Sequence, residues 1–291
     1  MKVAVVGPTG VLGRALVPLL IQDGHAVLAL ARSPQKVSDL FGGAVDAVEC
    51  DLLAASVDTL SRALDGCDAV LHIATAIPDD MTRADAWVAN TRLRTDGVRA
   101  LLDATLNAGV ERYLQQSITM AYPDCGDAWI TEDQPLDSTP QRATTTAPVI
   151  EMEAMIRRIS GAQLRWCILR GGLFVGHRTF QERAIDQLKQ GTAVIAGDGG
   201  AFQSFIHVED MASATAAALN AAPAGSTYNV VAEPLRQREY LEQLADAVGA
   251  PRPPYAADAA PLVSQRCSNL AARQALQWQP AHGIIPAAPG A

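Results

Sequence analysis

The chain has 291 residues, of which 49% are hydrophobic and 19% charged, so it is long enough to bury a substantial core. A net charge of −8 without a basic cluster argues against nucleic acid as the main partner. No apolar run approaches the ~18 residues of a membrane span, and no charged leader precedes an apolar segment, so we expect a cytoplasmic protein that does not act at a membrane. The cysteines are scattered, which is typical of reduced thiols, and no metal site is predicted.

The first chemically informative segment follows a short apolar strand at residues 2–6 and leads into a helical pattern. Its glycines have the spacing G-x-x-G-x-x-G, one residue longer in the first interval than the usual dinucleotide fingerprint. Between a strand and a helix, such a turn offers a pyrophosphate free backbone N–H groups, the positive end of a helix dipole and no Cβ atoms to block its approach. The predicted contacts are Gly7, Thr9, Gly10, Val11, Leu12 and Gly13.

Short strands alternate with helices over the first two thirds of the chain. This alternation predicts an α/β fold, in which helices cover both faces of a doubly wound parallel sheet. The predicted strands are residues 2–6, 26–31, 47–49, 69–73, 112–117 and 165–169. Two of the helices end at glycines, one at residues 88–108 before Gly109 and one at residues 148–160 before Gly161. The Ala/Pro-rich tail, residues 280–291, is expected to be loosely ordered.

Residues after the second and third strands can hold the rest of a dinucleotide. Arg32 stands where an NAD-binding fold commonly has an acidic residue for the ribose hydroxyls. An arginine there can pair with the 2′-phosphate of NADP, helped by Ser33 and Lys36, so we predict NADP(H) in preference to NAD(H). Asp51 and Leu52 suit the adenine, although a turn or helix cap explains Asp51 equally well.

Small residues after the fourth strand let the backbone pass close to the cofactor. They are Ala74, Thr75 and Ala76. A plain turn at the end of a strand would have the same composition. We also assign Gly172 and Leu173, which follow the sixth strand, to the cofactor site.

Further motifs, together with the glycine turn, resemble the extended or atypical branch of the short-chain dehydrogenase/reductase superfamily, in particular NAD(P)-dependent epimerase/dehydratase-like proteins. The resemblance covers nearly the whole chain and rests on residues 103–104, 108–112, 116–122, 168–172, 197–199, 205–212 and 228–230. It implies a Rossmann core over residues 1–170 and a small C-terminal substrate lobe over residues 171–291, with elements that return to the core. It also implies that Asp210 caps a helix that begins at Met211.

The catalytic pair that this resemblance implies is absent. Redox members of the superfamily use a tyrosine followed four residues later by a lysine, and this pair exchanges a proton with the substrate oxygen. None of the lysines in this chain lies four residues after a tyrosine. Alignment on Glu153 puts Thr145 at the tyrosine position and Val149 at the lysine position, and the usual Ser/Thr position falls on Ile118.

The first functional hypothesis is nevertheless NADP(H)-dependent reduction of a small organic carbonyl, enone or quinone-type substrate. A cofactor held over its acceptor supplies much of the rate advantage through orientation. Candidate proton donors or polar anchors are Ser117, Thr119, Tyr122 and Thr145. Packing of the loop explains Tyr122 as well, and bonds to backbone groups at the end of the strand explain Ser117.

Two other classes of function remain open. One is a non-redox lyase, cyclase or isomerase, in which His177 acts on the substrate and Arg178 anchors it, with a solvated loop as the alternative explanation. His207 is expected to be a satisfied internal histidine. The other class is a nucleotide-sensing protein without turnover, for which the loop at residues 123–146 is a candidate contact surface.

A homodimer is a further expectation. Related proteins often dimerise through the two helices predicted at residues 88–108 and 148–160. Met152, Met155 and Ile159 on the second helix suit a dimer interface or the core of one subunit equally well.

Overall fold

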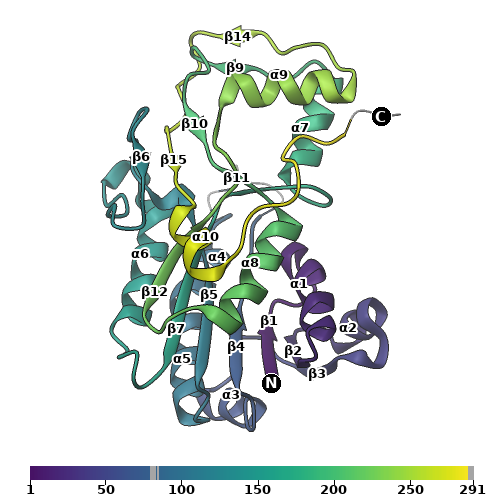
Figure 1. Cartoon of the computed structure of the whole chain (residues 1–291), viewed down its shortest axis with the longest axis vertical. Helices are drawn as coiled ribbons and strands as arrows, with labels where there is room; N and C mark the ends of the chain where they lie inside the picture. Colours follow the sequence, from purple (N-terminus) through teal and green to yellow (C-terminus); the bar gives the residue numbers. More distant parts are fainter. Residues whose placement is uncertain (79–82, 84, 288–291) are drawn as a thin grey trace.

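The computed structural model of the chain describes residues 1–78, 83 and 85–287. Its centre is a sheet of seven parallel strands in the order β12-β7-β5-β4-β1-β2-β3 (Figure 1). These strands are β1 (Lys2–Val6), β2 (Ala26–Ala31), β3 (Asp46–Glu49), β4 (Ala69–His72), β5 (Arg112–Ile118), β7 (Arg165–Gly171) and β12 (Ser226–Val230). The strand order reverses between β1 and β4, and doubly wound sheets bind ligands beyond the carboxyl ends of the strands at such a point. The predicted fold class is confirmed.

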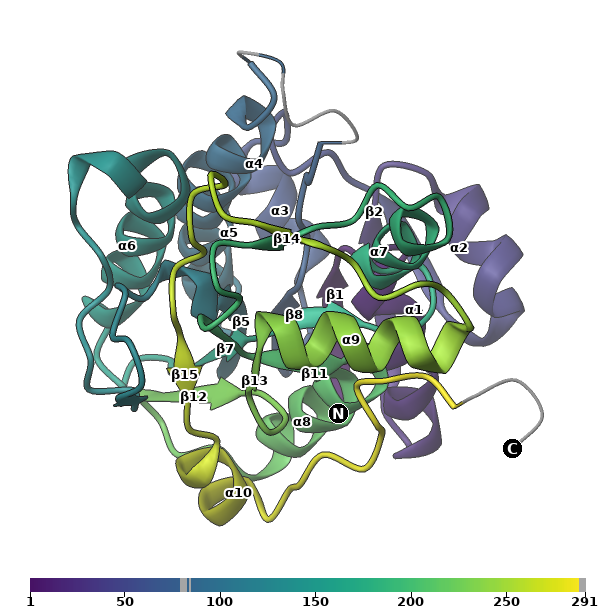
Figure 2. The ribbon, with the colours of Figure 1, turned by 90° about the horizontal axis from the view of Figure 1, so that it is seen from above.

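Helices cover both faces of the sheet (Figures 1 and 2). One layer contains α1 (Val11–Gln22), α8 (Val208–Ala221) and α10 (Leu270–Leu276), and the other contains α3 (Val57–Ala63), α5 (Val98–Asn107) and α6 (Ala143–Arg157). Alternate residues of β1 point to opposite faces, so Val3 and Val5 join the first core while Ala4 and Val6 join the second. The short helix α2 (Pro34–Phe41) packs beside β2 and β3.

The helix predicted at residues 88–108 contains a π-helical turn. It consists of α4 (Val88–Arg92), the π turn η2 (Leu93–Gly97) and α5, which ends just before Gly109, whose φ is +68°. A π turn takes more residues than an α turn, and such insertions are frequent at functional sites. The apolar spacing of the sequence did not predict it.

Helix α6 begins five residues before the predicted start, at Ala143 rather than at Pro148. A proline inside a helix removes one backbone hydrogen bond, which is why the prediction placed the start at Pro148. The carbonyl that loses its donor belongs to Thr144, which is exposed and open to water. The preceding turn is also reinforced, because the Thr146 hydroxyl donates to the carbonyl of Arg142 at 3.1 Å.

Residues after β7 divide between the sheet and a smaller lobe, drawn at the top of Figure 1. The lobe elements are β8 (Leu173–Val175), α7 (Phe180–Lys189), β9 (Ile195–Ala196), β10 (Phe202–Gln203), β11 (Phe205–His207), β13 (Leu235–Arg236), α9 (Gln237–Val248) and β14 (Tyr255–Ala256). Its own core includes Phe205 and Tyr240, whose rings stack with centroids 4.0 Å apart. By contrast, α8, β12 and α10 return to the large sheet (Figure 1).

The loop predicted at residues 123–146 contains structure of its own. Its strand β6 (Trp129–Ile130) pairs with β15 (Arg266–Cys267), and the 3₁₀ turn η4 (Pro140–Arg142) leads into α6. Two other 3₁₀ turns are η1 (Gly42–Ala44) and η3 (Thr119–Ala121). Of the residues weighed for a dimer interface, Met152 and Met155 are buried in the core of the single chain.

The C-terminal segment is anchored to the start of α8. The Asp210 carboxylate accepts the backbone N–H groups of Ala281 at 3.0 Å and His282 at 2.9 Å, and it pairs with His282 Nδ1 at 2.8 Å. The His282 ring stacks on His207, which is the N-cap of α8. The prediction for Asp210 was therefore wrong, because Asp210 holds the tail instead of capping a helix that begins at Met211. Ala281 and His282, in the tail expected to be loosely ordered, are anchored by these bonds. Residues 288–291 lie outside the described part.

Candidate cofactor and active site

The strand register brings the predicted cofactor-binding segments to one edge of the sheet. In the parallel pairs, Val6 lies opposite both Leu30 and His72, and Ala31 lies opposite Glu49. The residues that follow these strand ends must therefore be neighbours at the carboxyl edge. They are Gly7, Arg32, Asp51 and Ala74.

The glycine turn requires glycine at its first and last positions. Gly7 has a φ of +95°, and a Cβ there would lie 2.7 Å from the Cα of Ala74. A Cβ on Gly13 would lie 2.3 Å from the carbonyl oxygen of Pro8. The turn is thus packed tightly against the end of β4 and against the first turn of α1.

The N-terminus of α1 is open to a ligand. Gly10, its N-cap, is exposed and supplies no side-chain cap, and the first turn of α1 contains no acidic residue. The free N–H groups and the helix dipole therefore favour an anion. Thr9 and Val11 are half-buried beside this end, whereas Leu12 is buried in the core and can present only its backbone. These residues fit the pyrophosphate of a dinucleotide.

Arg32 and Lys36 lie beyond β2 and are both exposed. Within the described part of the chain, no carboxylate lies within ion-pair distance of either. Ser33 caps α2, because its Oγ accepts the N–H of Lys36 at 3.4 Å. This part of the edge therefore offers two cations that no carboxylate of the described residues neutralises.

The other predicted cofactor residues have mixed environments. Asp51 is exposed and its Oδ1 accepts the N–H of Leu53 at 3.0 Å, which is the turn role considered as its alternative. Leu52 is buried against Gly97 of the π turn. The N–H of Ala76 is bound by Asn90 Oδ1 at 3.2 Å, while Thr75 beside it is exposed.

Gly172 is buried and serves close packing. A Cβ there would lie 2.6 Å from the carbonyl oxygen of Ser204, and its N–H donates to Val230 at 3.0 Å. Leu173 is half-buried and lines a cleft in the small lobe.

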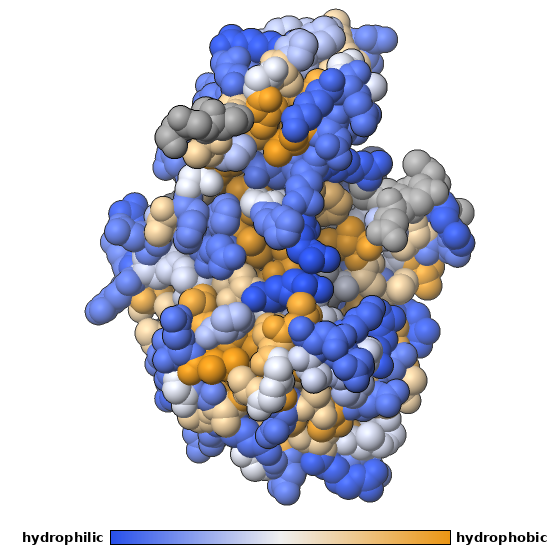
Figure 3. Space-filling model, turned by 90° about the vertical axis from the view of Figure 1, so that its right-hand side faces the viewer, coloured by the Kyte–Doolittle hydropathy of each residue, from blue (hydrophilic) through white to orange (hydrophobic). Residues whose placement is uncertain are grey.

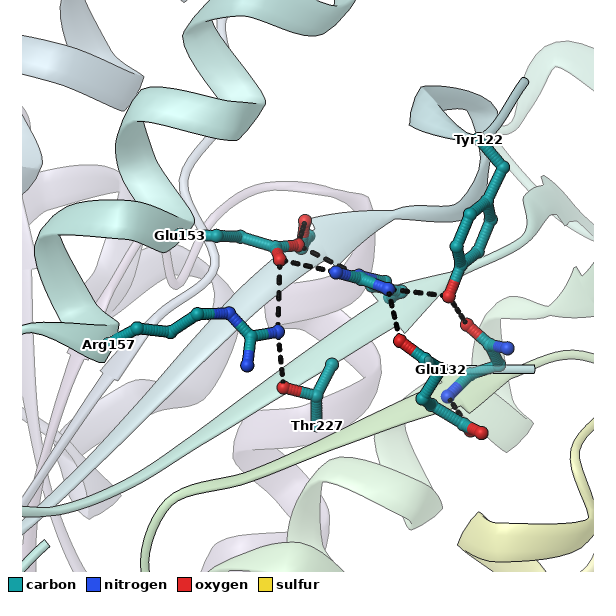
Figure 4. Close-up of polar contacts among 8 residues, drawn as sticks. Tyr122, Glu132, Glu153, Arg157 and Thr227 are labelled. Carbon is teal, nitrogen blue, oxygen red and sulfur yellow. Dashed lines mark hydrogen bonds and ion pairs between the residues drawn. The ribbon is translucent and has the colours of Figure 1, made fainter. Parts of the chain in front are cut away.

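Glu153 lies at the centre of a buried polar network (Figure 4). Its carboxylate accepts hydrogen bonds from Arg170 Nη2 at 2.6 Å and Nε at 3.0 Å, from Ser117 Oγ at 2.7 Å and from Arg157 Nη2 at 3.3 Å. Burial raises the pKa of Glu153, but the bonds and charge of Arg170 outweigh burial and bring the pKa below its usual value. Glu153 is therefore an ionised structural partner.

Tyr122 belongs to the same network (Figure 4). Its hydroxyl accepts a hydrogen bond from Arg170 Nη1 at 2.6 Å and donates one to Asn229 Oδ1 at 2.8 Å. The side chain is 0% exposed, and burial raises the pKa of Tyr122 despite the arginine. This geometry argues against the predicted role as proton donor. Ser117, also 0% exposed, is committed to Glu153 in the same way.

Two further candidates differ in their exposure. Thr119 is buried, and its hydroxyl donates to the carbonyl of Gly171 at 3.4 Å, so it too is turned away from a ligand. Thr145 is exposed in the first turns of α6. Of the four predicted polar anchors, Thr145 alone combines exposure with a place near the carboxyl edge.

His177 lies beside α1 rather than in a separate substrate site. It is exposed, and its Nδ1 lies 2.8 Å from Glu182 Oε1. With Arg178 it lines a cleft of about 370 Å³ between α1 and the start of α8, to which Arg14 and Glu209 also contribute. Its position therefore gives more support to a role at the edge of the cofactor site than to substrate chemistry.

The small lobe contains an apolar cleft of about 280 Å³ that the sequence did not predict. Its apolar lining includes Leu173, Phe174, Phe180, Phe205, Tyr240 and Leu241. Its polar lining comes from glutamine side chains, and none of the described residues that line it is Asp, Glu, Lys, Arg or His. Figure 3 shows apolar surface exposed in this lobe and along the middle of the molecule.

The described residues contain neither a membrane-spanning helix nor a metal-binding cluster. No helix in them is both long and apolar enough to cross a membrane. They also contain no group of three or more His, Cys, Asp or Glu side chains placed to bind a metal ion.

Comparison with known proteins identifies the family. The model of the NAD dependent epimerase/dehydratase family matches residues 3–231. A 3-diazoavenalumate denitrifying reductase from a Streptomyces species is 33% identical, covering 97% of each chain. A 2-alkyl-3-oxoalkanoate reductase from Stenotrophomonas maltophilia is 30% identical, covering 87% of this chain and 77% of its own.

Solved structures have the same fold. MoeE5 in complex with UDP-glucuronic acid and NAD superposes with a TM-score of 0.79 at 22% identity, over 98% of this chain and 95% of that one. DesIV, a dTDP-glucose 4,6-dehydratase from Streptomyces venezuelae with NAD bound, gives a TM-score of 0.79 at 22% identity, over 98% and 93%. The chain belongs to the NAD-dependent epimerase/dehydratase family of extended short-chain dehydrogenases/reductases, and within it is an NAD(P)-dependent oxidoreductase or epimerase.

Proposed function

We propose that the chain is an NADP(H)-dependent reductase of a small, uncharged organic carbonyl, enone or quinone-type substrate. The observation that carries the cofactor part is the edge formed by the open N-terminus of α1 and the unneutralised cations Arg32 and Lys36. A guanidinium and an ammonium without a carboxylate partner among the described residues suit the 2′-phosphate of NADP, where NAD has only a hydroxyl. The two relatives named above are both called reductases.

The lobe cleft supports an uncharged substrate. A nucleoside diphosphate needs cationic or backbone donors for its phosphates. The cleft offers aromatic and aliphatic side chains with glutamine amides, which suit a hydrocarbon body with one or two polar atoms. The UDP-sugar held by MoeE5 is therefore a poor guide to the substrate of this chain.

Each part of the site has a distinct task in the proposed reaction. When bound, the dinucleotide supplies the hydride. The glycine turn and α1 hold its pyrophosphate, and the side chains of Leu173 and Phe174 exclude water from the substrate. Since Ser117, Thr119 and Tyr122 are buried, the exposed hydroxyl of Thr145, or water beside it, delivers the proton to the substrate oxygen.

The test is NADPH oxidation with matched pairs of acceptors, each an uncharged aromatic ketone, enone or quinone and its carboxylated analogue. We expect turnover with uncharged acceptors and a KM higher by about tenfold or more for the charged analogues, because none of the described residues that line the cleft is a cation. Ala184→Glu puts a charge into the cleft lining and should raise KM for the uncharged acceptor. Gln190→Glu, at the exposed C-terminal end of α7, is the matched control.

Two results would contradict the proposal. One is a wide acceptor screen without NADPH consumption. The other is conversion of a substrate at an unchanged rate after the dinucleotide has been removed, which would support non-redox chemistry instead.

A further inference from the structure

The helical layer contains a buried guanidinium that has no carboxylate partner among the described residues. Arg94, in the π turn η2, is 9% exposed. Among the residues that the structure describes, its one hydrogen-bond contact is from Nη1 to the Met152 sulfur at 4.0 Å, and thioether sulfur is a weak acceptor. Glu153 acts on it electrostatically but accepts its hydrogen bonds from other groups. Such a charge is costly unless something else compensates it.

The position of Arg94 in its helix directs the guanidinium toward the cofactor edge. Asn90, four residues earlier, binds the N–H of Ala76 just beyond β4, so this end of the helix lies at the carboxyl edge. Residues four apart share a helix face, and long side chains lean toward the N-terminus of their helix. By these rules, the Arg94 side chain leans toward the N-terminus of its helix, that is, toward Asn90 and the segment after β4.

Helix α6 borders the same place from the other side. The Met152 sulfur that contacts Arg94 lies one turn after Val149, the position where the family's lysine was expected. The exposed Thr145 lies one turn before Val149. The guanidinium thus approaches the face of α6 that lacks the lysine ammonium.

A second buried polar group also lacks a hydrogen-bond partner among the described residues. His72, the last residue of β4, has its Nδ1 3.0 Å from Gln115 Oε1, which also accepts the Tyr113 hydroxyl. His72 Nδ1 is therefore the donor, and its Nε2 is a buried acceptor without a partner among the described residues. The charge of Arg94 contributes to the lowered pKa of His72. Among the described residues, His72 Nε2 is a buried acceptor without a partner and the Arg94 guanidinium has only a thioether contact, so each can take a polar ligand atom or water.

We propose that Arg94 is a catalytic residue that holds the substrate oxygen as it becomes negative, in place of the missing Tyr/Lys pair. This inference rests on the proposed reductase function. When hydride from the reduced nicotinamide forms the new C–H bond, the π electrons of the C=O bond move to oxygen, directly in a ketone or through the conjugated system in an enone. The guanidinium N–H groups stabilise the resulting alkoxide or enolate, and a proton from water or Thr145 then neutralises it. An uncharged substrate and a buried cation are compatible because the negative charge appears only during the reaction.

Three variants separate this role from a structural one. Arg94→Met removes the charge at similar length, Arg94→Lys keeps it, and Arg99→Met is the matched control. Arg99 also connects α5 with α6, through an exposed ion pair with Glu151 at 3.0 Å. We expect Arg94→Met to lower kcat/KM on the order of 10²-fold with unchanged NADPH affinity, Arg94→Lys to recover part of the loss and Arg99→Met to resemble the wild type. The melting temperature of Arg94→Met should not fall, because replacing an unpaired buried charge with an apolar side chain is neutral or stabilising.

The deciding readout is spectroscopic and does not depend on turnover. 4-Nitrophenol, whose phenolate absorbs visible light, is titrated with pH in the presence of protein saturated with NADP⁺. We expect wild-type and Arg99→Met proteins to favour the bound phenolate by about tenfold or more, and Arg94→Met to lose this preference. If Arg94→Met binds NADP⁺, retains wild-type phenolate preference and turns over normally, the assignment of Arg94 is wrong while the reductase proposal stands. Absence of NADP⁺ binding by the wild type would instead overturn the proposed function.

Discussion

Replacement of Glu153 by glutamine should strongly destabilise the protein, because it leaves Arg170 without its counter-ion. The two side chains are 3% and 5% exposed, and their closest atoms are 2.6 Å apart. Removing one member of a buried ion pair costs about 3–5 kcal/mol, since the remaining charge is left desolvated. The glutamine also points an amide donor toward a group that can only donate, so we expect a value near the upper end of this range.

The assay is urea unfolding followed by circular dichroism, with a thermal scan beside it. At roughly 2–4 °C per kcal/mol for a large domain, the melting temperature should fall by about 10 °C. Glu151→Gln is the control, because Glu151 lies on the same helix, is half exposed and pairs with Arg99 at the surface. Its effect should stay below about 1 kcal/mol.

A paired replacement tests the physical reason. Glu153→Met combined with Arg170→Met removes both charges and should recover much of the stability lost by Glu153→Gln alone, because it leaves no buried charge at this place, and Arg157, which also loses Glu153, is 41% exposed. The reasoning would be refuted if Glu153→Gln unfolded at the same urea concentration as Glu151→Gln. Failure of the double variant to recover would assign the loss to packing or to Tyr122 instead.

Three further predictions concern acid, the glycine turn and the tail. Burial lowers the pKa of His72 from 6.5 to about 4, so the stability that it confers is complete above pH 6.5 and is lost as the pH falls through 4. Between pH 7 and 4, urea unfolding should show about 3 kcal/mol more loss for the wild type than for His72→Asn, and equal losses would contradict this. Gly13→Ala forces a Cβ to 2.3 Å from a backbone oxygen and should weaken NADPH binding in calorimetry by about tenfold or more, while Gly43→Ala, with open space around it, should have no effect. Asp210→Asn weakens the anchor of the tail and should speed amide exchange in residues 281–287, whereas an unchanged exchange rate would show that the tail is held by other contacts.

The central sheet could be predicted from local pattern. The apolar strands and the glycine turn have short-range signals, and the six predicted strands differ from the observed ones only at their ends, as in β7, which continues to Gly171. The seventh strand, β12 (Ser226–Val230), was not predicted. The place of Arg32 directly after β2 could be predicted because it depends on the same local order. The π turn could not be predicted, because it has no distinct spacing signal. The early start of α6 could not be predicted either, because a proline such as Pro148 is uncommon inside a helix.

The environments of the polar site residues were harder to predict from the sequence, because burial depends on contacts between distant parts of the chain. Tyr122 and Ser117 are plausible proton donors by sequence, but Asn229 and Arg170, 107 and 48 residues after Tyr122, bind its hydroxyl in the core. Arg94 carries no motif, and only the structure shows that it is buried without a carboxylate partner within the described residues.

The most direct test of the account is calorimetric titration of the nucleotide-free protein with NADPH and NADH, for the wild type and for Arg32→Ala. We predict NADPH binding at micromolar concentration or tighter, NADH binding weaker by about tenfold or more, and an Arg32→Ala variant that loses most of this difference by weakening NADPH alone. Equal affinity for the two nucleotides that Arg32→Ala leaves unchanged would contradict the assignment of NADP(H). Binding of neither nucleotide would contradict the cofactor site itself.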